Sequence, residues 1–228
     1  MNIIEMTDEQ ASSSFEQFFD RISTFCETNP VIAKEIFEAK EEFFAMTGKV
    51  RDNEDEFNTR MNAFLLWFIF DRKPHESLYS PVSKYQIHLE KTGWFNELEV
   101  LNNQLVHVHS LFKIVKIKNG ITFVKDLISG IKYEIEDENT LMGMSKDIYF
   151  ETRLFTFNDK RCFSNYFIQH PPIVNKGIRK QLKPVKREKK LIKPFLLKLH
   201  TFNNKYHKYR SIDIKSIYHF DQSIPEAK

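Results

Sequence analysis

The period of the apolar residues changes near residue 104, and this change limits the folds open to the chain. Up to about residue 103, apolar side chains recur every three or four residues, as on one face of an amphipathic helix. From Leu105 to Ile168 they alternate with polar residues, as in half-buried strands. The pattern predicts an α+β protein in which helices precede a small antiparallel sheet.

Cap signals divide the first part into four predicted helices. Asn29 with Pro30, and Ser80 with Pro81, each place an N-cap residue before a proline at the first helical position. The helix after Ser80 is expected to run past Gly93 toward residue 102.

Turn signals divide the second part into five predicted strands. The pairs Asn119-Gly120, Ser129-Gly130 and Asn158-Asp159 are typical of tight turns. Five short strands joined in this way indicate a small curled sheet or an antiparallel β barrel. The strands are expected over residues 105–117, 121–127, 132–136, 148–157 and 161–168.

A third segment follows His170, Pro171 and Pro172. We expect one helix over residues 173–182 that Pro184 ends, another from residue 194, and a final strand over 211–220. The predicted organisation is a helical domain over 1–103, a small β module over 104–170 and a basic helical C-terminal region over 171–228.

Charge is distributed unevenly along the chain. Residues 176–210 contain thirteen Lys and Arg residues and one acid, Glu188, whereas residues 1–175 carry a net charge of −8. Concentrated positive charge favours a polyanionic partner and indicates no particular reaction.

Nucleic acid, either RNA or DNA, is the leading predicted ligand of this basic segment. Cations contact phosphates, and the interleaved residues Tyr206, His207 and Tyr209 can stack on the bases of a single strand. The alternatives are an acidic protein partner, an anionic membrane surface, and a solvated face that pairs with the acidic part of the same chain. The predicted nucleic-acid-binding residues are Lys176, Arg179, Lys180, Lys183, Lys186, Arg187, Lys189, Lys190, Lys205, Lys208 and Arg210.

Two other functions stay open. The helix from Pro194 carries an apolar stripe that would suit a partner's groove, as in a protein-interaction or scaffold module. An enzyme with an unfamiliar site comes third, because no group of residues suggests catalytic roles. Non-catalytic binding is therefore the predicted function.

The spacing of glycines and histidines predicts neither a cofactor nor a metal. The six glycines are never closer than ten residues, so the glycine-rich loops that bind nucleotides are absent. His107 and His109 fall on one face of a strand, with His170 at the end of the last strand, but no Cys or carboxylate is placed by the sequence to complete a ligand set. We expect the two strand histidines to be a solvent-facing pair.

No segment of the sequence is expected to cross a membrane. The longest dense apolar stretch, residues 63–70, is far shorter than the roughly 20 residues that a spanning helix needs. The N-terminus lacks the charged and apolar regions of a secretory signal, so a cytoplasmic protein is expected.

The most distinctive local string is WFIFDR at residues 67–72. It resembles a W-[FY]-x-F-D-R motif of uncharacterised bacterial proteins that join such a helical segment to a small β module, and the similarity covers residues 57–80. The resemblance implies the same layout here, and no activity or functional residue. We expect Asp71 and Arg72 to pair at the helix exit and Trp67 to lie in the core, or alternatively in a groove with Trp94.

Overall fold

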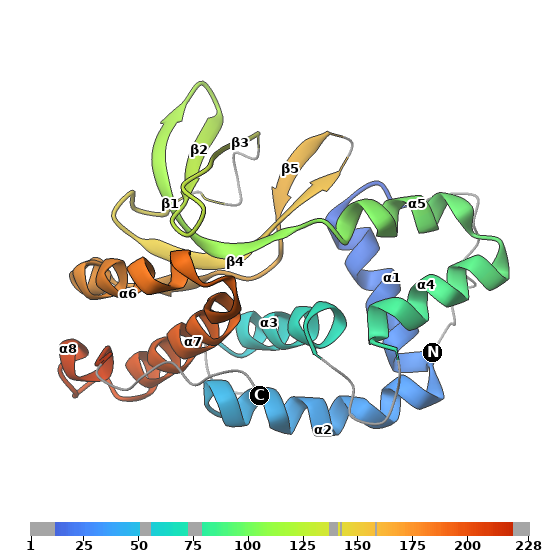
Figure 1. Cartoon of the computed structure of the whole chain (residues 1–228), viewed down its shortest axis with the longest axis horizontal. Helices are drawn as coiled ribbons and strands as arrows, with labels where there is room; N and C mark the ends of the chain where they lie inside the picture. The colour runs from blue at the N-terminus through green and yellow to red at the C-terminus, as the bar shows by residue number, and fades with distance from the viewer. Residues whose placement is uncertain are drawn as a thin grey trace.

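A computed structural model describes residues 12–50, 56–72, 79–136, 141, 143–157 and 159–220 of the chain. A curled antiparallel sheet lies on one side of the molecule and helices lie on the other, with the long strand β4 (Tyr149–Phe157) between them (Figure 1). The α+β class predicted from the sequence is confirmed.

Within the described residues up to 104, the chain forms five helices instead of the four predicted. They are α1 (Phe15–Thr28), α2 (Pro30–Thr47), α3 (Phe57–Phe70), α4 (Pro81–Thr92) and α5 (Phe95–Gln104). Ser14, Asn29 and Ser80 cap α1, α2 and α4, each side chain accepting a hydrogen bond from a backbone N–H of the first turn. The predicted fourth helix is divided because Gly93 adopts a φ of 76° and ends α4.

The apolar faces of these helices form one core that includes residues of the sheet. Trp67 is 9% exposed and Phe64 is 1% exposed, which confirms the expected core position of this part of α3. Phe155 of β4 packs on Phe15 of α1 with ring centroids 4.7 Å apart, so the sheet closes the helical core.

The sheet has the strand order β3-β2-β1-β4-β5, and the short strand β6 pairs with β4. All the pairings are antiparallel. Asn119, with a φ of 52°, and Gly120, with a φ of 73°, form the predicted turn between β1 and β2. The strands other than β4 are β1 (Val108–Lys118), β2 (Ile121–Asp126), β3 (Lys132–Ile135), β5 (Lys160–Phe163) and β6 (Ile168–His170).

The sheet curls into a half-barrel whose two edges approach each other. The Lys160 ammonium on β5 lies 3.3 Å from the Glu136 carboxylate just after β3. Arg161 lies over the ring of Tyr133, 5.2 Å from its centroid. Buried apolar residues such as Phe112 fill the concave side.

The C-terminal part covers the opposite, convex side of the sheet. It consists of α6 (Asn175–Arg187), α7 (Ile192–Lys208), α8 (Ile214–Ile217) and two short 3-10 helices, η1 (Pro172–Val174) and η2 (Lys189–Leu191). Leu111 of β1 and Tyr149 of β4 share a core with the buried faces of α6 and α7.

Two predictions for this part were wrong. Pro184 does not end the first helix, because α6 continues through it to Arg187 with Pro184 on the exposed side. Residues 211–220 form no strand, because Ile217 and Tyr218 are neighbours in sequence and both are buried against α7. A short helix can bury two adjacent residues, whereas a strand sends them to opposite faces.

Candidate functional site

Helix α6 is amphipathic, and its packing decides where its cations point. Ile178, Leu182 and Val185 recur at helical spacing and are buried in the core shared with α7 and the sheet. The basic residues occupy the other positions of the helix. They therefore face away from the core.

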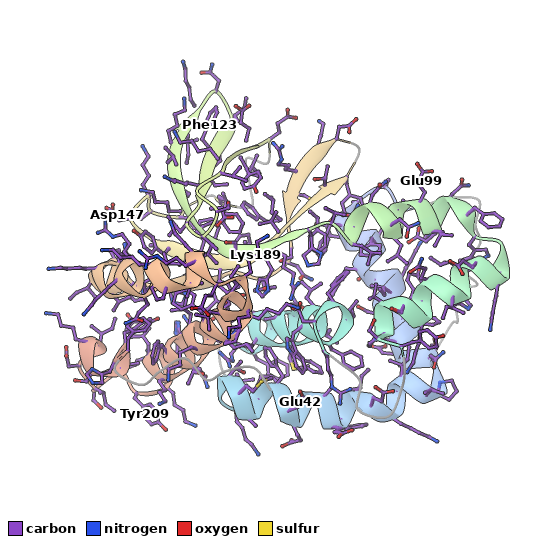
Figure 2. The ribbon with its side chains drawn as sticks, viewed as in Figure 1. Glu42, Glu99, Phe123, Asp147, Lys189 and Tyr209 are labelled. Carbon is purple, nitrogen blue, oxygen red and sulfur yellow. The ribbon has the colours of Figure 1, made fainter. Side chains whose placement is uncertain are left out.

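All eleven residues predicted to contact nucleic acid are exposed. The structure divides them into a larger and a smaller group at opposite ends of α7. Figure 2 shows Lys189, of the larger group, at the junction of α6 and α7, and Tyr209, which lies between two residues of the smaller group, at the far end of α7. The larger group, which we call the α6–η2 basic face, is Lys176, Arg179, Lys180, Lys183, Lys186, Arg187, Lys189 and Lys190. The smaller group at the end of α7 is Lys205, Lys208 and Arg210.

The α6–η2 basic face has few ion pairs. Within the described part of the chain, its one ion pair with a carboxylate joins Lys190 to Glu188 at 3.8 Å, and Glu188 belongs to the same segment. Among the acids of residues 1–175 that could neutralise this face, Glu136 pairs with Lys160, and Asp137 lies outside the described residues. The face therefore keeps most of its positive charge available to a partner.

The aromatic residues near the end of α7 differ in exposure. Tyr209 is 44% exposed, and the Lys208 ammonium lies 5.8 Å from its ring centroid. Tyr206 and His207 are only half-buried and their rings pack on each other. One exposed ring beside a cation suits a stacking contact at this end of α7.

A second set of polar residues, buried or half-buried, lies on the helix-facing side of the sheet. In β1 and β4 the odd-numbered side chains point to this side, and the pairs His109 with Arg153 and Leu111 with Glu151 stand directly opposite each other. His109, Arg153 and Glu151 meet His200 of α7 and Tyr166, which follows β5. We call this set, with Asp71 and His107, the buried polar cluster.

Glu151 is the centre of the buried polar cluster. Its carboxylate accepts hydrogen bonds from His109 Nε2 at 2.6 Å and from the Tyr166 hydroxyl at 3.1 Å. The other carboxylate oxygen contacts Nε2 of His200. One buried carboxylate thus joins two strands, a loop and helix α7.

Asp71 is the second anion of the cluster. It contacts Arg153, and its other oxygen lies 2.7 Å from Nζ of Lys193, which is exposed at the start of α7. The expected pair of Asp71 with Arg72 does not form. Arg72 instead turns to α2, where its Nε donates to Glu42 at 2.9 Å.

Arginine fixes the tautomer of His107. Arg153 can only donate, so His107 Nε2 accepts its N–H at 2.6 Å. His107 Nδ1 then carries the proton and donates to the Gln104 carbonyl oxygen at 3.0 Å. The imidazole is therefore held in its neutral form.

Burial and neighbouring charges shift the pKa values of the cluster. Burial lowers the pKa of His107 to about 3, and Arg153 adds to this effect. Burial also acts to raise the pKa of Glu151, but His200 and His109 outweigh it and hold the pKa well below its usual range. Burial likewise acts to raise the pKa of Asp71, but Arg153 outweighs burial and lowers this pKa. Both carboxylates are therefore ionised at neutral pH.

The arrangement suits a structural link better than a reaction. The cavity beside the cluster has a volume of about 10 Å³, which is roughly the space of one water molecule and too small for a substrate. In the described residues no group of three or more His, Cys, Asp or Glu side chains is arranged to hold a metal ion. The cluster holds the sheet on α3 and α7.

The expected positions of the histidines need correction. His107 and His109 do not face solvent, because the odd-numbered side of β1 is the side that the helices cover. His170 lies apart from them, and its Nδ1 is 2.9 Å from the Tyr218 hydroxyl. Sequence reasoning missed Glu151 and Arg153, although charged residues at two-residue spacing in a mostly apolar strand are a signal for a polar cluster on one face.

Within the described residues, no helix has the length and apolar character that crossing a membrane requires. No curated protein matches the chain. No solved structure matches it either. A family described as a family of unknown function (DUF7986) matches residues 21–219, a range that includes α2 to α8, the whole sheet and both groups of basic residues. The chain therefore belongs to this family of unknown function.

Proposed function

We propose that the protein binds nucleic acid through the α6–η2 basic face. The observation that carries this proposal is the set of eight exposed cations on one helix and the turn after it, with Glu188 as the one carboxylate that contacts them in the described structure. Phosphates bind such cations with release of counterions, which gives affinity without base recognition.

The buried face of α7 favours this function over a protein-interaction module. The apolar stripe that would enter a partner's groove includes Phe195, Leu199 and Phe202, and these side chains are 0%, 0% and 3% exposed. They already pack in the protein's own core. An acidic protein or an anionic membrane surface is an alternative partner for the same cations.

Other expectations from the sequence stay predictions. A cytoplasmic location would place the basic face where nucleic acid is available. The resemblance of residues 67–72 to bacterial proteins supports the layout of helices beside a β module and adds no activity.

Fluorescence anisotropy with labelled 24-nucleotide DNA, single-stranded and duplex, tests the proposal. We expect binding at low salt and a log–log salt dependence with a slope of about −4 to −5 for six released counterions. Replacing Lys186, Arg187, Lys189 and Lys190 with Gln should weaken binding of all sequences alike and make the slope shallower.

The matched control replaces four cations elsewhere with Gln, namely Lys34, Lys40, Lys91 and Lys160. This control has the same net charge as the fourfold variant of the α6–η2 basic face. It should bind DNA nearly as tightly as the parent protein does. No binding at about 100 μM protein and low salt would remove nucleic acid as the ligand, because even non-specific association is ordinarily detectable there. An equal loss in both variants would assign the binding to net charge alone.

A further inference from the structure

Three lysines stand in one row across three strands of the sheet. Lys113 of β1 is directly opposite Lys125 of β2, and Lys125 is directly opposite Lys132 of β3. Opposite residues of antiparallel strands point to the same face with Cβ atoms about 5 Å apart. The row therefore gathers three positive charges on one side of the sheet.

The row lies on the convex side of the sheet, next to the C-terminal helices. Lys113 is also directly opposite Tyr149, and it follows Leu111 by two residues on the same face of β1. Leu111 and Tyr149 are buried in the core shared with α6 and α7. Lys113 therefore borders this core, at about 5 Å between Cβ atoms from Tyr149 across the strands and about 7 Å from Leu111 along β1.

Further lysines extend the same side toward the tip of the hairpin. After the bulge in β1, Lys116 is opposite Phe123 and Lys118 is opposite Ile121. The Lys116 ammonium covers the ring of Phe123 at 4.2 Å from its centroid, near the top of the hairpin in Figure 2. Among the described residues of β1 to β3, Glu134 is the one acid on this side, since Asp126 points inward to Ser110.

The row is unfavourable to the fold unless an anion binds it. Like charges directly opposite each other on a sheet are destabilising. Within the described structure no carboxylate forms an ion pair with Lys113, Lys125 or Lys132. Lys132 is exposed, and Lys113 and Lys125 are half-buried. A sheet that keeps three facing lysines has a face complementary to a polyanion.

We propose that this lysine row is a second part of the interface and that the occupant is the backbone of a nucleic-acid duplex. The inference rests on the proposed function, which assigns binding to the α6–η2 basic face. A duplex carries one charge per about 1.7 Å of its axis, roughly twice the density of a single strand, so it offers more phosphates to two sets of cations at once.

The α6–η2 basic face and the lysine row both lack exposed aromatic rings, and this favours a duplex over a single strand as the ligand. Single strands bind best where their bases stack on exposed aromatic side chains. Helix α6 has no aromatic residue, and on the lysine side of β1 and β2 the ring of Phe123 is covered by Lys116. Ammonium groups without stacking surfaces contact phosphates, whichever base is present.

The test compares a triple variant, Lys113→Gln, Lys125→Gln and Lys132→Gln, with the charge-matched control Lys34→Gln, Lys40→Gln and Lys91→Gln. The probes are a labelled 24-base-pair DNA duplex and the same strand alone, at several salt concentrations. For the duplex, the log–log salt slope of the row variant should be shallower by about 0.9 for each phosphate contact removed. The control should keep the slope of the parent protein. The parent protein should bind the duplex at least about tenfold more tightly than the single strand.

A melting experiment provides an independent readout. Removing the repulsion within the row should raise Tm by roughly 1 to 4 °C in the row variant, and the control should show no such rise. Weaker binding by a more stable protein excludes misfolding as the cause of the loss.

The outcomes separate this inference from the proposed function. In one outcome the row variant binds the duplex with an unchanged salt slope, whereas the variant of the α6–η2 basic face binds with a shallower slope. The lysine row is then no part of the interface, and the proposed function stands. Equal or tighter binding of the single strand overturns the duplex as occupant. If the parent protein binds neither probe, the proposed function itself fails.

Discussion

At the scale of single residues, the buried polar cluster shows how one carboxylate joins distant segments. Glu151 lies between His109 on the neighbouring strand and His200 on α7, and it is fully buried. A buried carboxylate is tolerated only when hydrogen bonds and opposite charge compensate its lost hydration. The contacts of Glu151 are therefore coupled to the packing of α7 on the sheet.

We expect Glu151→Gln to lower the free energy of unfolding by about 3 kcal/mol, because removing one partner leaves the imidazoles without their charged acceptor. Urea denaturation of the variant measures this loss. The control is Glu99→Gln on the exposed side of α5, which should change stability by less than about 0.5 kcal/mol. Equal stability of the two variants would show that the cluster does not hold the helices on the sheet.

At the scale of elements, the end of α2 approaches α7 most tightly at Gly48. Gly48 ends α2 with a φ of 91°, and a Cβ built there would lie 2.2 Å from Nδ2 of Asn204 on α7. Arg60 of α3 donates to the Gly48 carbonyl oxygen at 3.0 Å. Three helices therefore meet where a larger residue has no room.

Gly48→Ala should destabilise the protein more than Gly130→Ala does. Both glycines have positive φ, at 91° and 83°, but a Cβ at Gly130 meets nothing within 4 Å. Backbone strain alone should cost about 1 to 3 kcal/mol at each position, and the contact with Asn204 should add at least about 1 kcal/mol at Gly48. Thermal unfolding of both variants measures the difference.

Adding Asn204→Ala to Gly48→Ala isolates the contact between the helices. The double variant should recover part of the loss, since the methyl group added at Gly48 would then have room. Purely additive effects would contradict a direct clash between these two positions.

At the scale of the whole molecule, acid should unfold the protein over a wide pH range. Burial, together with Arg153 for His107 and with His200 for His170, lowers the pKa of both imidazoles from 6.5 to about 3. Between these values the unfolded chain binds more protons than the folded one. The free energy of unfolding therefore falls as the pH falls from about 6.5 toward 3.

The carboxylates act in the same direction at lower pH. The folded pKa values of Asp71 and Glu151 are depressed, so their contribution is present above their unfolded pKa and is lost as pH falls below about 4. Urea denaturation between pH 7.5 and 4 should show a loss of stability that begins near pH 6.5 and approaches roughly 1.4 kcal/mol per pH unit for each group that titrates only in the unfolded chain. A constant stability from pH 7.5 to 5 would contradict neutral buried histidines.

Much of the fold follows from local signals in the sequence. Caps such as Asn29 and turns such as Asn119-Gly120 act within a few residues, so they mark helix starts and hairpins without knowledge of the rest of the chain. The exposure of the predicted basic residues follows in the same way, because Ile178, Leu182 and Val185 recur at the period of a helix. Local signals failed where a buried neighbour decided the conformation, as at residues 211–220.

The sequence by itself determined that helices precede a small sheet and that a basic helical segment follows it, since periodicity, capping and charge are written along the chain. Only the tertiary structure decided that Asp71, His109 and Glu151 meet, and that lysines of three strands form one row. The physical reason is that strand register and the curl of the sheet arise from packing between residues far apart in sequence. His109 and Lys113 point to the same side of β1, but the helices cover His109 whereas Lys113 lies beside them, so the position along the strand decides whether a charge joins the buried cluster or the row.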